Sequence, residues 1–226
     1  MVTALVKGTQ IRTAGYDRVK QKRSIKGSFR TVLQSRNMIA LYLTMPTLFF
    51  TAGVFSTLFS VYANATLLLS PSVISLLFAV RGLADTFTRI PAGYISDRIG
   101  RKWPLIVSLS LIVITFICIS IRNFAFIIFG FIIYGIAFGI RTVTMSALAG
   151  DSVPPEDIGL TMAFLFATTD AGSSLGSIFA GATSIVLPSS TIFQIAAFIL
   201  CVTIPILWFV QEPTNRSSSR KRDSHV

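Results

Sequence analysis

Six long apolar segments alternate with short polar connectors along this chain of 226 residues. Each segment approaches the roughly 20 residues that an α-helix needs to cross the hydrocarbon core of a bilayer. The pattern predicts six transmembrane helices, over residues 38–63, 72–95, 104–121, 124–149, 159–186 and 191–210. The connectors hold at most nine residues. The sequence therefore leaves no room between the helices for a domain outside the membrane.

The predicted architecture is an all-α membrane protein, a bundle of six transmembrane helices over residues 38–210. A basic arm, residues 1–37, precedes the bundle, and a basic tail, residues 211–226, follows it. The apolar run that opens the arm is shorter than the roughly 7 to 15 residues of a signal-peptide core, so we expect no secretory signal. The end of the arm has the spacing of a short surface helix, whereas residues 1–25 are equally compatible with a disordered linker.

Composition agrees with a membrane protein. Hydrophobic residues make up 52% of the chain, charged residues 13%, and the mean hydropathy is +0.71. The net charge of +11 does not indicate nucleic-acid binding, because the basic residues lie at the ends of apolar segments rather than on one soluble face. Cys118 and Cys201 lie inside apolar segments without metal-ligand spacing, so we expect no disulfide framework, metal or cofactor.

The distribution of Lys and Arg predicts the orientation in the membrane. Sixteen of them lie in the arm, the connector at 96–103 and the tail, all on one side, whereas the other side holds only Arg122. By the positive-inside rule both termini are cytoplasmic, and the expected location is the inner or plasma membrane.

The connector between the second and third predicted helices carries the most specific motif. Residues 93–102, here named the signature segment, follow the pattern Gly-x-x-x-Asp-Arg-x-Gly-Arg-Lys. This pattern resembles the signature loop of the major facilitator superfamily of secondary transporters. The resemblance implies transport of a small organic solute by alternating access, coupled to protons. It also implies a transporter built from two six-helix halves, of which this chain supplies one.

In that family the aspartate and arginine of the loop form a cytoplasmic latch that holds one conformation and breaks during transport. The corresponding residues of this chain are Gly93, Asp97, Arg98, Gly100, Arg101 and Lys102. Gly93 would permit close helix approach and Gly100 the chain reversal. The alternative is a basic turn that only sets the topology.

The acidic connector at 150–158 offers partners for the latch. Asp151, Glu156 and Asp157 are the acids that could pair with Arg98 or Arg101. Members of the family commonly carry a basic residue where this chain has Ile158, so the charge network departs from the family pattern there.

Five charged residues lie within the predicted helices, where charges are costly and commonly functional: Arg81, Asp85, Arg89, Arg141 and Asp170. The first three are spaced i, i+4 and i+8 and share one helix face, so Asp85 can pair with either arginine. Both local neutralisation and a proton relay remain open for this trio. By helix height, Asp170 could pair with Arg141 or Arg81.

The resemblance also implies which helices line the central cavity. The first and fourth helix of each half do so in the family, which makes Arg141 the first candidate to face substrate and Thr47 and Thr51 weaker ones. A hydroxyl in a transmembrane helix is more often satisfied by the carbonyl of its own preceding turn.

Small residues predict close helix packing at two places. Gly135 and Gly139 form Gly-x-x-x-Gly, and Gly172, Gly176 and Gly181 lie along the fifth helix. Since lipid supplies no hydrophobic drive between helices, such glycines let backbones approach closely.

The basic segment before the first helix and the glycine pattern of the fifth indicate the C-terminal half of the family fold. The expected partners are the lipid bilayer, a small solute, protons, and either a companion N-terminal half or a second copy. Two alternatives stand beside transport: a truncated or split half without transport of its own, and a self-associating channel or membrane scaffold. No nucleophile–base pair or phosphate loop appears, so we expect no enzyme and no nucleic-acid partner.

Overall fold

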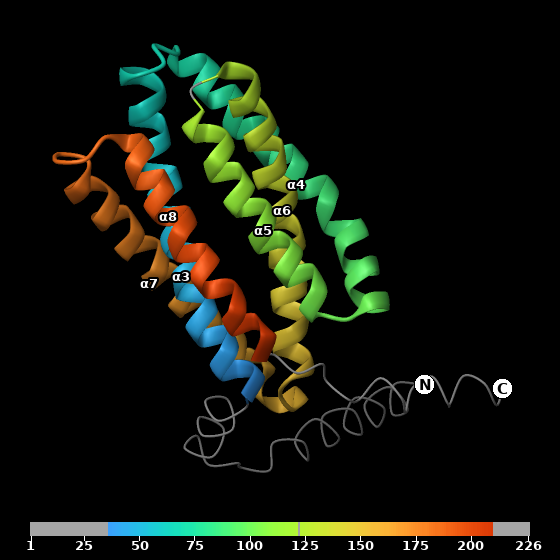
Figure 1. Ribbon diagram of the computed structural model, residues 1–226. Coiled ribbons are helices and arrows are strands. Elements are labelled where there is room, and N and C mark those ends of the chain that lie inside the picture. Colours follow the sequence, from blue (N-terminus) through green and yellow to red (C-terminus); the bar gives the residue numbers. More distant parts are fainter. Residues whose placement is uncertain (1–35, 122, 210–226) are drawn as a thin grey trace, which may run out of the picture.

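A computed structural model describes residues 36–121 and 123–209 (Figure 1). The basic arm and the basic tail, with the predictions that concern them, lie outside the described residues. The described chain is all-helical, as predicted, with six α-helices and two short 3-10 helices. In chain order these are α3 (Arg36–Ala65), α4 (Pro71–Ile99), α5 (Lys102–Ser120), α6 (Phe124–Asp151), η1 (Pro155–Asp157), α7 (Ile158–Thr183), α8 (Ser189–Thr203) and η2 (Ile204–Phe209).

Three of the described helices are long and apolar enough to cross a membrane by length and composition. These are Met38–Ala65 of α3, Lys102–Ser120 and Phe124–Asp151. Helices α4 and α7 have 29 and 26 residues, but charged and small polar side chains lower their hydropathy. Helix α8 has only 15 residues, and the segment predicted at 191–210 continues from it as the 3-10 helix η2.

The helices associate in pairs. Helix α3 packs along α7, and α4 packs along α6. Helix α5 contacts both α6 and α8, and α8 contacts α3, so α5 and α8 join the two pairs. In Figure 1, α4, α5 and α6 lie together on one side of the bundle, and α3, α7 and α8 on the other. Close approach of the backbones of α3 and α6 is sparse, so side chains fill the space between them.

The core between these pairs is rich in aromatic rings. Phe55 of α3 is fully buried, and its ring lies 4.4 Å from that of Tyr134 and 5.3 Å from that of Phe131, measured between centroids. The ring of Phe116 in α5 also contacts that of Phe55, with 6.2 Å between their centroids. Aromatic side chains bury large areas and prefer such stacked and edge-on arrangements. One cluster thus fastens α3 to α5 and α6.

Glycines set the closest helix contacts, as predicted. A Cβ on Gly139 would lie 2.7 Å from the carbonyl oxygen of Asp85, and one on Gly135 would lie 2.7 Å from the Ala84 Cβ, so α6 touches α4 backbone to backbone. On α7, Gly172 and Gly176 leave no room for a Cβ against the backbone of Pro46 and Phe50 in α3.

The prediction is wrong for Gly181, next to which a Cβ would meet nothing within 4 Å. Gly181 lies near the end of α7 and is exposed, so no neighbouring backbone approaches it.

The signature segment is more helical than predicted. The polar connector expected at 96–103 shrinks to Gly100 and Arg101, because α4 continues to Ile99 and α5 begins at Lys102. Gly100 ends α4 with φ of 102° and ψ of 167°, a conformation that is open essentially only to glycine. The expected role of Gly100 in the chain reversal is therefore confirmed.

Candidate functional site

Arg101 is the centre of a polar cluster at the end of α4. Its Nη1 lies 2.6 Å from Asp97 Oδ1, and its Nε lies 3.0 Å from Asp151 Oδ2. Nη1 also donates a hydrogen bond to Ser96 Oγ at 3.1 Å. The side chain of Arg101 is only 12% exposed. One guanidinium thus joins two carboxylates from different helices, and the planar fork of five N–H donors suits this geometry.

Local structure places each group of the cluster. Ser96 and Asp97 lie on the last turn of α4, and the positive φ of Gly100 turns the chain so that Arg101 faces back onto that turn. Asp151 is the last residue of α6, which packs along α4. The sequence-predicted pair of Asp97 and Arg101 is therefore brought together, with Asp151 beside it.

The other predicted latch residues make different contacts in the described part of the chain. The Cζ of Arg98 stacks 4.2 Å from the centroid of the Tyr94 ring. Glu156 is exposed, and within the described residues no ion pair joins it to Arg98 or Arg101. Asp157 is buried, and its backbone carbonyl accepts the hydroxyl hydrogen bond of Thr161 at 2.9 Å.

Two further residues of the signature segment have ordinary surroundings. A Cβ on Gly93 would make a normal van der Waals contact with Val143 at 3.5 Å, so Gly93 does not require its small size as Gly139 does. Lys102 is half-buried and is the first residue of α5.

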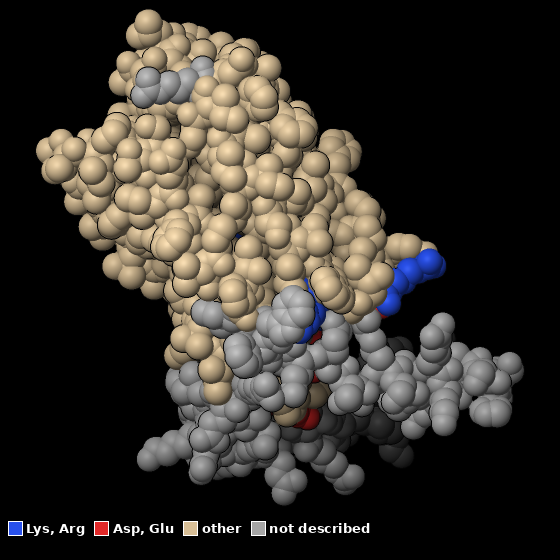
Figure 2. Space-filling model, viewed as in Figure 1, with Lys and Arg blue, Asp and Glu red and all other residues tan. Residues whose placement is uncertain are grey.

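On the face drawn in Figure 2, most of the visible charged side chains lie at one end of the molecule. In the view of Figure 2 the helical body is almost wholly tan, whereas blue and red atoms lie at the end next to the grey segments. At this end α4 is followed by α5, and α6 ends. The Arg101 cluster lies here.

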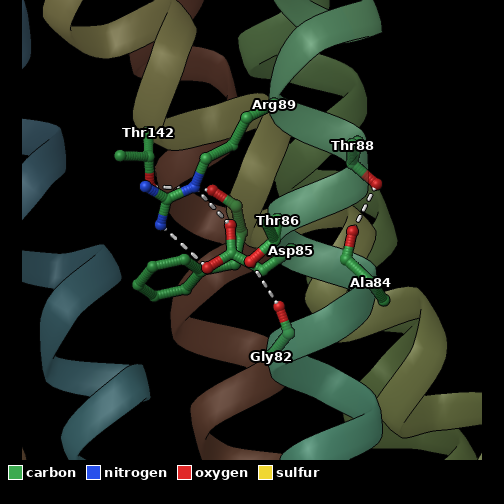
Figure 3. A network of polar contacts seen from close by, with 8 residues as sticks. Gly82, Ala84, Asp85, Thr86, Thr88, Arg89 and Thr142 are labelled. Atoms are coloured by element: carbon green, nitrogen blue, oxygen red, sulfur yellow. Dashed lines mark hydrogen bonds and ion pairs between the residues drawn. The ribbon is translucent and has the colours of Figure 1, made fainter.

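Within the helices, Asp85 and Arg89 form a bidentate pair. Arg89 Nε donates to Asp85 Oδ1 at 3.0 Å, and Nη2 donates to Oδ2 at 2.9 Å. Figure 3 shows the two side chains turned toward each other along α4. The neighbouring hydroxyls of Thr86 and Thr88 bond to carbonyls of the preceding turn. Of its two possible partners, Arg81 and Arg89, Asp85 thus forms its ion pair with Arg89.

Arg141 of α6 is the largest fully buried side chain among the described residues, 1% exposed. Its Cζ lies 4.3 Å from the ring centroid of Phe49 and 4.2 Å from that of Phe138, so the guanidinium is held between α3 and α6. All three of its nitrogens are buried without a hydrogen-bond partner in the described part of the chain. The hydroxyl of Thr144, about one turn further along α6, is likewise buried without a hydrogen-bond partner in the described residues.

Arg81 approaches the same aromatic surface from α4. Its Cζ lies 4.7 Å from the Tyr134 centroid and 5.0 Å from the Phe138 centroid. Asp170, in contrast, is exposed on α7, and no ion pair links it to Arg81 or Arg141 among residues 36–121 and 123–209.

The two threonine candidates of α3 use their hydroxyls locally. Thr47 donates to the carbonyl of Leu43 at 3.2 Å and Thr51 to that of Leu48 at 2.7 Å. Sequence reasoning missed the rings of Phe49 and Phe138 and the hydroxyl of Thr144. Arg141 lies three residues after Phe138 and three before Thr144, which was an available signal, because residues three apart are neighbours on a helix surface.

The bundle of apolar helices, three of them long and apolar enough to cross a bilayer, is that of an integral membrane protein. The sequence profile of the Major Facilitator Superfamily matches residues 41–225. The chain therefore belongs to the Major Facilitator Superfamily, and its six α-helices correspond to one six-helix half of that fold. A comparison with curated proteins found no match.

Proposed function

We propose that this chain moves a small organic solute across the inner or plasma membrane by alternating access, coupled to protons, with both termini cytoplasmic. It acts as the C-terminal half of the transporter, beside a companion six-helix half or a second copy. Family membership supports the transporter class. The contacts of Arg101 support the alternating-access step, because they join two helix ends through groups that can separate.

The cluster around Arg101 is suited to act as a latch. Asp97 and Asp151 face water, so water can solvate either carboxylate when it separates from Arg101, whose side chain is 12% exposed. Ion pairs of this exposure contribute little to stability, commonly about 0 to 1 kcal/mol each. Such a cluster is weak enough to break in every transport cycle and specific enough to favour one conformation.

The latch is tested by changing Asp97 in two ways. Asp97→Lys places a cation next to Arg101 and should reduce uptake by about tenfold or more, since a 1.4 kcal/mol bias in a conformational equilibrium is tenfold. Asp97→Glu keeps the carboxylate and serves as the matched control, with most of the uptake retained. Surface labelling checks that both variants insert normally. Equal uptake by correctly inserted Asp97→Lys and wild-type protein would contradict the latch.

Reconstitution in liposomes separates transport from the alternatives. Saturable uptake by the purified chain alone supports a transporter formed by two copies, and uptake only with a co-expressed N-terminal-type half supports a companion chain. Ohmic currents would instead support the channel. A chain that shows neither uptake nor current in any combination would support the truncated half or a scaffold.

A further inference from the structure

The buried guanidinium of Arg141 lacks the groups that ordinarily accompany a buried charge. An arginine carries five N–H donors and remains protonated in proteins. Burying a charge costs several kcal/mol unless it is paired and hydrogen-bonded. The rings of Phe49 and Phe138 offset part of this cost through cation–π contacts, which are worth about 0.5 to 2 kcal/mol, but they accept no conventional hydrogen bond.

The charges that face this region from the packed helices do not balance. Helix α4 contributes Arg81, Asp85 and Arg89, and α6 contributes Arg141. The single carboxylate among them, Asp85, already forms two hydrogen bonds with Arg89. Two guanidinium groups, those of Arg81 and Arg141, therefore share the Phe138 ring without a carboxylate of their own in the described part of the chain.

Asp170 does not correct this imbalance. It is exposed on α7, and it forms no ion pair with either arginine in the described residues. An anion from outside the bundle would supply both the missing charge and the missing hydrogen-bond acceptors.

The position of Arg141 fits a binding site. It lies ten residues before the end of α6 at Asp151, about 15 Å along the helix axis and thus near the middle of the membrane. Its guanidinium lies at the junction of α3 and α6, whose backbones seldom come close and are joined mainly by side chains. Separation of the Phe49 and Phe138 rings would open this junction without disturbing the glycine contacts between α4 and α6.

The walls of the junction also indicate the shape of the ligand. Two aromatic rings flank the guanidinium, and the unpartnered hydroxyl of Thr144 lies one turn away on α6. A carboxylate could accept from Arg141 in the bidentate manner that is typical of arginine, and Thr144 could donate to it. An apolar body attached to that carboxylate would pack against the rings.

We propose that Arg141, with Arg81 beside it, binds the carboxylate of a small organic anion with an apolar or aromatic body, and that this anion is the class of solute transported. That the anion is transported rests on the proposed transport function, whereas the anion site itself does not.

The first test compares two probes of nearly equal shape on the purified full-length chain in nanodiscs. Benzoate carries the carboxylate, and benzamide replaces it with a neutral amide. Calorimetric titration should show saturable binding of benzoate, at least about tenfold tighter than that of benzamide, since a site built for a charged group strongly rejects the neutral analogue. Equal affinity for the two probes, or no saturable binding of benzoate, overturns the proposal.

The second test assigns the site to Arg141. Arg141→Gln should weaken benzoate binding by about tenfold or more, as expected when one partner of a buried charge pair is removed. Arg141→Lys keeps the charge but lacks the planar guanidinium. Its affinity for benzoate should lie between those of the wild type and Arg141→Gln. Arg98→Gln is the matched control, because it removes the same charge from an exposed side chain that stacks on Tyr94, about 20 Å along α4 from Asp85.

The hydroxyl pair on α6 gives a finer control. Thr144→Val removes an unpartnered hydroxyl and should weaken benzoate binding, whereas Thr142→Val removes one that already donates to the Phe138 carbonyl at 2.8 Å. If Arg98→Gln weakens binding as much as Arg141→Gln does, the anion is attracted by net charge alone and the assigned site is wrong.

Uptake measurements separate this proposal from the proposed function. Benzoate that binds at Arg141 but is not taken up by liposomes in any combination of halves would leave the site standing and refute transport. Saturable uptake of neutral solutes, unaffected by Arg141→Gln and without benzoate binding, would leave transport standing and refute the anion site.

Discussion

Gly176 offers the sharpest test of how the bundle is held together. A Cβ at this position would overlap the backbone carbonyl of Phe50, so Gly176→Ala must push α7 away from α3. The obstacle is the backbone of a helix and cannot rotate away as a flexible side chain would. Overpacking typically costs about 1 to 3 kcal/mol, and a rigid obstacle places this variant near the upper end.

The same substitution at Gly181 is the matched control. Gly181 belongs to the same helix, and a Cβ there would meet nothing within 4 Å. Replacing glycine by alanine within a helix gains about 0.5 to 1 kcal/mol in either variant, because alanine loses less conformational entropy on folding. That gain cancels in the comparison. The difference between the two variants should therefore equal the overpacking cost, about 3 kcal/mol.

Unfolding in mixed micelles of dodecyl maltoside and sodium dodecyl sulfate, followed by circular dichroism, measures this difference. Gly181→Ala should match or slightly exceed the wild type, and Gly176→Ala should unfold at a clearly lower fraction of sulfate. Two variants of equal stability would refute the view that the α3–α7 contact depends on the absence of a Cβ at residue 176.

Two further predictions concern α4. Gly100→Ala should lower the free energy of unfolding by about 1 to 3 kcal/mol, because alanine is strained at a φ of 102°. Gly82→Ala, with open space around the new Cβ, should not lower it. The same unfolding assay measures both variants, and equal stabilities would contradict backbone strain at residue 100. A double-mutant cycle of Asp85→Asn and Arg89→Gln should give a coupling energy of about 0.5 kcal/mol, since the Arg89 side chain is half exposed. A coupling several times larger would show that the pair is desolvated in the membrane.

Much of the fold could be predicted from the order of apolar and polar residues. Helix α6 begins at Phe124, as the apolar pattern predicted, because Asn123 caps it by accepting from the Ala125 N–H at 2.9 Å. The small residues at 135 and 139 indicated a close contact, since lipid-embedded helices pack through such positions. The sequence did not show that this contact is made with α4, because the spacing of small residues marks a packing face but does not indicate which helix packs against it.

The signature segment shows a similar division. Its motif indicated the family and the pairing of Asp97 with Arg101, which are four residues apart. The choice of Asp151 among three acids of the following connector required the structure, because only the packing of α6 along α4 places one carboxylate within 3.0 Å of Arg101. The extension of α4 to Ile99 was missed because polar residues at a helix end resemble a turn in a hydropathy pattern.

The sequence by itself therefore determined the class of protein, the number of helices and the motif at their junction, because these depend on local composition and short-range spacing. The tertiary structure alone decided that Arg141 is buried without a hydrogen-bond partner in the described residues. Arg89 and Arg141 are both arginines within apolar helices. One of them lies a helical turn from Asp85, and the other lies between Phe49 and Phe138. The Asp85–Arg89 pair is local to α4, whereas the position of Arg141 against Phe49 arises from the packing of α6 against α3, two helices that are far apart in the chain. That position carries the proposed specificity for an organic anion.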